Sequence, residues 1–271
     1  MMVAGAPELV ARFAHARERG RCAFIPYVMA GDPDRETTAA IIAALRDCGA
    51  DVIELGIPYG DPLADGPTVA AAAMRALRAG TTIDDVLAIV ARVRDMGSPP
   101  VVLFTYYNPV VQYGVRRFAR AAAAAGAAGV IVPDLSLEEA SEMRAATREE
   151  GLAFPMLIAP TTPPDRARRI VESADGFVYV VSRLGVTGTA AGPERERLER
   201  QLATLRAVTS LPLAVGFGIA RAAQVRALAA VADGVVVGSA LIDAAAGLQG
   251  ASAAAAVRSA AAPLIAAAAR G

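Results

Sequence analysis

The sequence predicts an α/β protein built as a single (β/α)8 TIM barrel with an extra N-terminal helix. Eight short runs rich in β-branched and other apolar residues alternate with helical segments along the chain. Most of these runs are almost continuously apolar, as expected for parallel strands covered on both faces. No change in composition divides the 271 residues, so we expect one domain over residues 1–271. A doubly wound open sheet is the alternative, but eight evenly spaced units leave no residues for a second domain.

The elements follow in a regular order after an amphipathic helix expected over 7–19. The predicted strands are 22–29, 51–57, 101–107, 129–134, 153–160, 176–182, 211–218 and 234–240. The predicted helices are 35–48, 67–79, 84–96, 109–125, 136–150, 165–173, 194–208 and 220–231, and an alanine-rich helix closes the chain. Asp34, Ser136 and Asp165 are the expected caps near helix starts. In this fold the functional residues follow the strand ends.

The composition excludes several kinds of chemistry. The chain contains no lysine, so it forms no lysine Schiff base, no lysine-bound pyridoxal phosphate and no Walker site. Its one histidine, His15, is too little for a Ser-His-Asp triad or a histidine-ligated zinc site, and we expect no metal. Chemistry must therefore come from carboxylates, tyrosines, hydroxyls and backbone dipoles.

Charge and patterning also indicate the setting. The formal net charge is zero, and no basic stretch suggests binding to nucleic acid. The N-terminus does not resemble a secretory signal, and Arg258 and Pro263 interrupt the alanine-rich end, which argues against a membrane span. Two cysteines, Cys22 and Cys48, are compatible with a reduced compartment, and we expect a cytoplasmic protein.

The stretch "DVIELGIPYGDPLADGP" (51–67) places one acid in a strand and two in the loop after it. Alternation puts Glu54 opposite Ile53 and Leu55, so Glu54 points into the barrel if those two face the helices. Burial would raise its pKa toward neutrality, which suits a group that gives and takes a proton. A structural acid paired with an arginine is an equal alternative. For Asp65, on the proline-rich loop, simple capping of the next helix is the safer interpretation from position alone.

Glycines cluster where the last three strands end. The segments "SRLGVTG", "GFGIA" and "GSA" place Gly188, Gly218, Gly238 and Ser239 just after strands six, seven and eight. Phosphate sites in this fold are commonly built after strands seven and eight. Bare amides at helix N-termini attract phosphate without any lysine, and glycine allows a close approach. Together these segments predict a phosphate site.

Aromatic residues at the same end suggest a pocket for a flat ring. The candidates for an apolar wall are Phe24, Phe104, Tyr106, Ile131 and Phe217, although each singly is more often a core residue. Tyr179, in the sixth strand, either faces the barrel and bonds a carboxylate across it or packs between sheet and helix.

These motifs resemble one family. "FIPYVMAGDPD", "ELGIPYGDPLADGP", "SRLGVTG", "GFGI" and "VVVGSALI" occur in the order and spacing of tryptophan synthase alpha subunits, from Phe24 to Ile242. The resemblance implies retro-aldol cleavage of indole-3-glycerol phosphate to indole and glyceraldehyde 3-phosphate, in L-tryptophan biosynthesis. It also implies an alpha-beta-beta-alpha complex with a beta subunit that carries pyridoxal phosphate, and no cofactor in this chain.

The resemblance assigns residues as well. The family's catalytic glutamate, aspartate and tyrosine match Glu54, Asp65 and Tyr179, and its phosphate-holding positions match Gly188, Gly218, Gly238 and Ser239. One departure is "GIPYGDP", where the family often has "GIPFSDP"; the changed residues, Tyr59 and Gly60, lie beside the catalytic loop.

The chemistry is consistent with this assignment. Cleavage of an aldol needs an electron sink, and the indole ring serves as its own sink once C3 is protonated. We therefore expect Glu54 to transfer protons and Asp65 to accept a hydrogen bond from N1–H. The alternatives are another phosphate-sugar barrel enzyme, a free-standing indole-3-glycerol phosphate lyase without a beta partner, and a non-catalytic binding subunit. Intact Glu54 and Asp65 argue against the last.

Overall fold

The computed structural model describes residues 5–182, 193–216 and 218–270. Its core is an eight-stranded sheet with the order β4-β3-β2-β1-β8-β7-β6-β5, and each strand runs parallel to its neighbours in this order. All eight predicted strands are confirmed, and each is shorter than predicted. They are β1 (Ala23–Met29), β2 (Ile53–Gly56), β3 (Val101–Phe104), β4 (Gly129–Ile131), β5 (Met156–Ile158), β6 (Val178–Val181), β7 (Leu213–Gly216) and β8 (Gly234–Val237).

The two ends of the sheet meet beside β4 and β5. Gly129 forms a parallel bridge with Ala153, just before β5. Val130 N donates to Ala153 O at 2.9 Å, and Ala153 N donates to Ala128 O at 3.0 Å. These bonds close the sheet into a barrel, as the sequence predicts, and exclude the open sheet.

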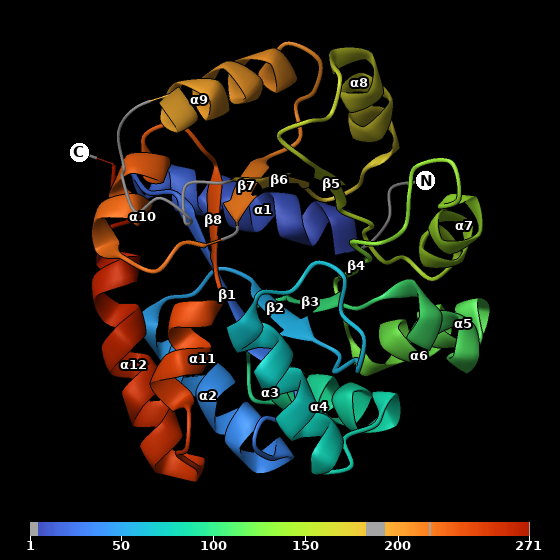
Figure 1. Cartoon of the computed structure of the whole chain (residues 1–271), viewed down its shortest axis with the longest axis vertical. Coiled ribbons are helices and arrows are strands. Elements are labelled where there is room, and N and C mark those ends of the chain that lie inside the picture. Colours follow the sequence, from blue (N-terminus) through green and yellow to red (C-terminus); the bar gives the residue numbers. More distant parts are fainter. Residues whose placement is uncertain (1–4, 183–192, 217, 271) are drawn as a thin grey trace.

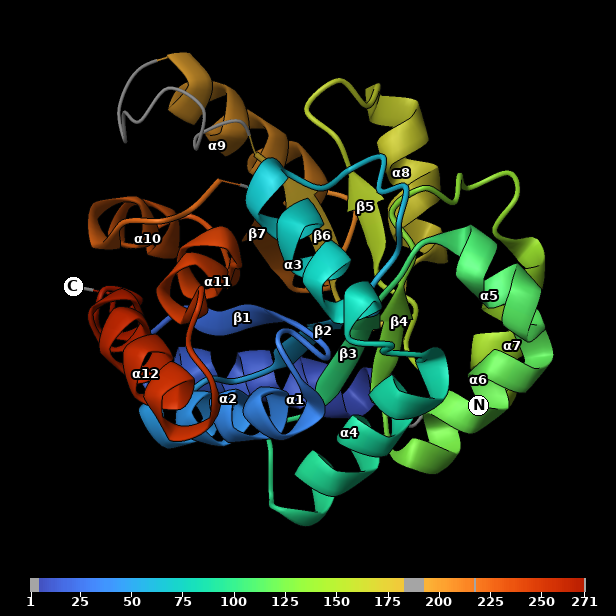
Figure 2. The same cartoon turned by 60° about the horizontal axis from the view of Figure 1, so that its bottom comes forward.

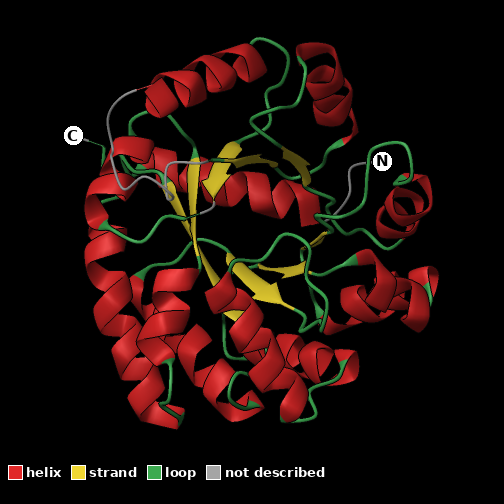
Figure 3. Cartoon of the chain, viewed as in Figure 1, coloured by secondary structure: helices red, strands yellow, loops and turns green. Residues whose placement is uncertain are grey.

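Helices surround the strands on all sides (Figures 1 and 3). They are α1 (Gly5–Glu18), α2 (Arg35–Cys48), α3 (Pro67–Arg78), α4 (Ile83–Asp95), α5 (Tyr107–Tyr113), α6 (Val115–Ala125), α7 (Ser141–Glu149), α8 (Pro164–Ser173), α9 (Pro193–Arg206), α10 (Ala222–Ala229), α11 (Ser239–Ala245) and α12 (Gly250–Ala266). Both views place α12 beside α2, so the last helix packs on the first β/α unit (Figures 1 and 2). Among the described residues, no helix is long and apolar enough to cross a membrane.

The helix predictions need three corrections. The stretch 109–125 forms two helices, because Gly114 adopts a φ of 94°, which breaks the helix. Asp34 caps α2 as predicted, accepting from Thr37 N at 2.7 Å. Ser136 lies before α7 and bonds Glu139 instead, and Asp165 lies within the first turn of α8, so neither is an N-cap.

Strand alternation divides the core into two apolar clusters. The outer cluster lies between strands and helices and contains Ile53 and Leu55 of β2. The inner cluster fills the barrel and contains Val52 together with Tyr27 of β1. Glu54 therefore points into the barrel, as alternation predicts.

Helix α1 seals the end of the barrel where the strands begin. Its Leu9, Phe13 and Ala16 belong to the inner cluster. The Phe13 ring lies 5.5 Å from the Phe177 ring, and a Cβ on Gly234 would lie only 2.6 Å from Phe13. Glycine at 234 therefore makes room for the helix, and among the described residues the open end of the barrel is the opposite one.

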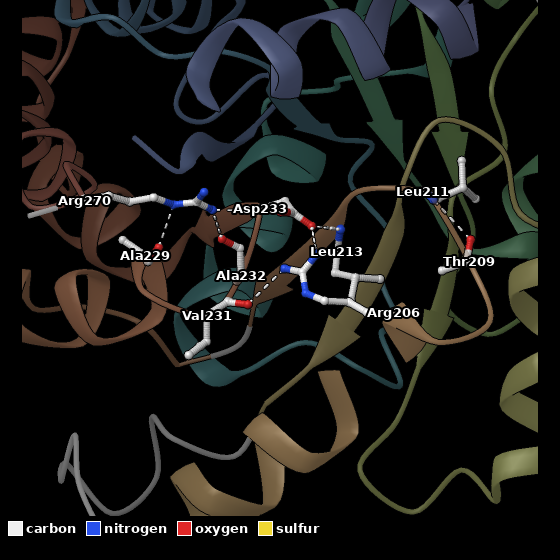
Figure 4. Close-up of polar contacts among 9 residues, drawn as sticks. All are labelled: Arg206, Thr209, Leu211, Leu213, Ala229, Val231, Ala232, Asp233 and Arg270. Atoms are coloured by element: carbon white, nitrogen blue, oxygen red, sulfur yellow. Dashed lines mark hydrogen bonds and ion pairs between the residues drawn. The ribbon is translucent and has the colours of Figure 1, made fainter. Parts of the chain in front are cut away.

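An ion-pair network holds the C-terminus against the last strands (Figure 4). Asp233 accepts from Arg206 at 3.0 Å and from Leu213 N at 3.0 Å, and pairs with Arg270 at 3.8 Å. Arg270 also donates to Ala232 O at 2.6 Å. These contacts connect α9, β7, β8 and the C-terminus on the side opposite the opening.

Candidate active site

A cavity of about 540 Å³ opens at the carboxyl ends of the strands. The N-terminal turn of α3 forms one side of it, and in Figure 2 α3 lies across this end of the barrel. Its lining residues come from strands β1, β2, β3, β6 and β8, from the loops after β2, β6, β7 and β8, and from the starts of α3 and α11. They are Tyr27, Glu54, Asp65, Gly66, Pro67, Thr68, Val69, Phe104, Tyr179, Val181, Ser182, Gly218, Val236, Gly238 and Ser239. Seven of the twelve site residues predicted from the sequence line this one cavity: Glu54, Asp65, Phe104, Tyr179, Gly218, Gly238 and Ser239.

Glu54 is the buried acid of the cavity. Its side chain is 2% exposed, and burial, with Asp65 nearby, raises its pKa to about 8. Among the described residues its Oε2 atom has no hydrogen-bond partner, and no arginine pairs with it. The acid that an arginine neutralises is Asp51, three residues earlier, which bonds Arg21 Nη2 at 2.6 Å and Phe24 N at 2.8 Å. The purely structural interpretation therefore suits Asp51 and not Glu54.

Asp65 does not cap the helix that follows it. The N-cap of α3 is Gly66, which makes no side-chain bond, and Pro67 begins the helix. Asp65 is half-buried at the cavity, and burial raises the pKa of its carboxyl while the neighbouring Tyr106 hydroxyl lowers it. Tyr106 also accepts from Ala64 N at 3.0 Å, so it holds the loop on which Asp65 lies.

Two buried tyrosines face the acids. A Cβ on Gly216 would lie 2.2 Å from the Tyr179 hydroxyl, and a Cβ on Gly56 would lie 2.0 Å from the Tyr27 hydroxyl. Each tyrosine therefore reaches over a glycine on the next strand. Burial raises the pKa of both phenols well above the usual value, and the nearby Glu54 and Asp65 raise it further. Both remain neutral hydrogen-bond donors. Tyr179 faces the barrel, as the first of its two interpretations predicts.

Sequence reasoning missed Tyr27. The alternation of side chains in β1 could have found it, because Phe24 and Val28 face outward and Tyr27 faces inward. Tyr27 is also the last polar side chain before the end of β1. Ser182, Val69 and Val181 also line the cavity and had no distinguishing pattern.

The glycine segments meet at one side of the cavity. Gly218, with a φ of 70°, follows β7, while Gly238 and Ser239 join β8 to α11. A side chain at Gly238 would contact the Tyr27 ring, with a Cβ 3.2 Å from Tyr27 Cβ. No arginine lies among the described lining residues, so the donors available to an anion here are main-chain N–H groups and the hydroxyl of Ser239. Gly188 lies outside the described residues.

The predicted apolar wall is only partly assembled. Phe104 lines the cavity and packs edge-on against Tyr27, with ring centroids 5.8 Å apart. Phe24 belongs to the outer cluster, so its predicted place in the pocket is wrong: its neighbours Ala23 and Ile25 point inward and turn it toward the helices. Ile131 is fully buried in the inner cluster. Tyr106 stands behind the Asp65 loop, and Phe217 lies outside the described residues.

The chain was compared with known proteins. The family model described as "Tryptophan synthase alpha chain" matches residues 13–268. The chain belongs to this family. The tryptophan synthase alpha chain of Thermosynechococcus vestitus is 48% identical over 239 residues, covering 87% of this chain and 89% of the relative. That of a Synechocystis species is 50% identical over 239 residues, covering 86% and 89%.

Solved structures of tryptophan synthase agree with the fold. A chain of Mycobacterium tuberculosis tryptophan synthase superposes with a TM-score of 0.88 at 39% identity, covering 97% of this chain and 98% of that one. The tryptophan synthase alpha chain of Legionella pneumophila gives a TM-score of 0.85 at 34% identity, with 96% of each chain covered.

Membership in the tryptophan synthase alpha chain family fixes the general activity. The family cleaves indole-3-glycerol phosphate to indole and glyceraldehyde 3-phosphate, a lyase reaction in tryptophan biosynthesis. Its alpha chain carries no cofactor and pairs with a beta subunit, which holds pyridoxal phosphate. Nothing in these comparisons supports the alternative of a free-standing lyase.

Proposed function

We propose that this tryptophan synthase alpha chain cleaves indole-3-glycerol phosphate with Glu54 as proton-transfer group and Asp65 as the partner of the ring nitrogen. The single observation that supports this most is the pair itself: two carboxyls with raised pKa values line one cavity and have different surroundings. Pairs of acids held in unequal environments are typical of sites where one donates a proton and the other remains charged.

The reaction follows in three steps. Glu54, neutral at pH 7 because its pKa is about 8, gives its proton to C3 of the indole ring. Asp65, ionised, accepts a hydrogen bond from N1–H and stabilises the positive charge that forms on the ring. The bond between C3 and the glycerol carbon then breaks as the hydroxyl on that carbon loses its proton to Glu54. Indole and the aldehyde leave, and Glu54 is again neutral.

The other end of the substrate needs an anion site. We place the phosphate at Gly218, Gly238 and Ser239, which line the same cavity as the two acids and offer backbone N–H groups as donors. Phe104 supplies an apolar contact for the ring. Tyr179, a neutral donor, keeps the proton-transfer end of the site in place.

The test is release of indole from indole-3-glycerol phosphate, measured with and without the beta subunit. Glu54→Gln keeps the size of the side chain but removes the proton, and we expect turnover to fall by about 10²–10⁴-fold with KM little changed. Turnover near the wild-type value would remove Glu54 from the mechanism.

We place the working protein in the cytoplasm, as one domain over residues 1–271, in an alpha-beta-beta-alpha complex. Two unpaired cysteines, Cys22 and Cys48, support the reduced compartment. The packing of α12 on α2 supports a single domain. The mass of the complex formed with a cognate beta subunit tests the stoichiometry.

A further inference from the structure

Tyr27 and Glu54 are neighbours across two parallel strands. Their Cα atoms are register partners in the β1–β2 pair, and both side chains point into the barrel. Both also line the cavity. Adjacent positions on one face of a sheet bring side chains within contact of each other.

The Tyr27 hydroxyl lies where the cavity begins. It reaches over Gly56, the residue two positions after Glu54 on the same face of β2, and a side chain at 56 would fill its place. The edge-on contact with Phe104 fixes the ring. The hydroxyl makes no hydrogen bond to another residue that the structure describes. Because Tyr27 lines the cavity, its hydroxyl is available to an acceptor that forms during the reaction.

The Glu54 carboxyl lacks a hydrogen-bond donor at its Oε2 atom among the described residues, and this atom is buried. This costs little while the carboxyl is neutral. Once the proton has moved to C3 of the indole ring, Glu54, which is only 2% exposed, carries a full negative charge, and a buried charge requires a donor.

We infer that Tyr27 is a positioning residue whose hydroxyl donates a hydrogen bond to the Glu54 carboxylate once Glu54 has given up its proton. The inference rests on the proposed role of Glu54 as proton donor. The burial that keeps the phenol protonated makes Tyr27 a donor and not a second acid. Its action resembles that of an oxyanion hole, directed at the enzyme's own carboxylate.

The inference predicts a change that a purely structural role would not cause. Among the described residues, the titratable groups that face Glu54 are Asp65, Tyr27 and Tyr179. Tyr27→Phe removes one donor and leaves the ring packed on Phe104. We therefore expect the Glu54 pKa to rise by about one unit and kcat to fall by about 10- to 100-fold, with KM changed less than threefold.

The experiment uses the full chain in complex with its beta subunit for kinetics, and the full chain alone for titration. The Glu54 pKa is read from the pH dependence of the difference in unfolding free energy between each protein and its Glu54→Gln derivative. Tyr113→Phe is the matched control, because it also removes a phenol, one that bonds Asp84 at 2.5 Å on the outer helix α5. It should leave both readouts unchanged.

The outcomes separate the two proposals. A lower kcat together with a higher Glu54 pKa supports the inference. Either change without the other, or a change in KM alone, overturns it. If Glu54→Gln itself keeps near-normal turnover, the proposed function fails first, and that result is distinct because it does not involve Tyr27.

Discussion

The hydroxyl oxygen of Tyr106 accepts a hydrogen bond from the backbone N–H of Ala64 at 3.0 Å. Ala64 directly precedes Asp65 on a loop whose tip is open to solvent, with Leu63 80% exposed. Tyr106 itself is buried, between Tyr59 and Phe104. A fixed side chain between β3 and α5 thus holds the backbone of the loop that carries an acid of the site.

We expect Tyr106→Phe to loosen this loop. The Ala64 amide loses its acceptor, so its hydrogen exchange should become faster, and kcat should fall several-fold as Asp65 is held less well. Tyr59→Phe is the control: it removes a phenol from the same ring pair, but its hydroxyl contacts Asn108 at 3.2 Å and not the loop backbone. Unchanged exchange at Ala64 in Tyr106→Phe would contradict the prediction.

Asp65→Asn should lower kcat by roughly 10²–10³-fold while substrate still binds, because the amide stays polar but carries no charge for the ring nitrogen. In the wild type, activity should rise with pH as Asp65 ionises, at a pH above the usual range for aspartate since burial raises its pKa. In the Asp65→Asn variant, this rise of activity with pH should be absent. Asp61→Asn, on the same loop and exposed, should behave as wild type in pH–rate measurements. If the activity of Asp65→Asn still falls at low pH, a group other than Asp65 causes that fall.

Glu54→Gln should stabilise the fold, and the gain should depend on pH. The unfolded chain releases the Glu54 proton near pH 4.5, and the folded chain retains it to about pH 8. Between these values the folded state binds more protons, so wild-type stability falls as pH rises. The gain in the variant should grow across this range and stay constant above it, reaching on the order of a few kcal/mol. Chemical denaturation at a series of pH values measures it, and a flat difference would contradict a raised pKa.

Asp51→Asn should lower the stability of the fold and leave the activity unchanged, which is the reverse of the effects expected for Glu54→Gln. It breaks the buried pair with Arg21 at the strand beginnings and should cost about 3 kcal/mol of unfolding free energy. Indole release per folded molecule should remain normal, because Asp51 does not line the cavity. A large loss of kcat in this variant would mean that the two ends of β2 are coupled.

Sequence alone was sufficient for the periodic features of the chain. Helix α2 begins and ends where its pattern predicts, because Asp34 and Gly49 provide local start and stop signals. The inward orientation of Glu54 follows from a period of two within one strand. The motif around Asp65 is distinctive enough to indicate the family from the sequence alone.

Tertiary structure decided which neighbours each side chain meets. Phe24 looks as suitable for a ring pocket as Phe104, but only the closed barrel defines which face of β1 is inside. Likewise, only the structure shows that Gly66 is the N-cap of α3 and that Asp65 faces the cavity. The hydrogen bond between Tyr106 and Ala64 joins residues 42 positions apart in the sequence. A strand fixes the alternation of its side chains locally. Which face is buried, and against which partner, depends on contacts between strands that are far apart in the chain.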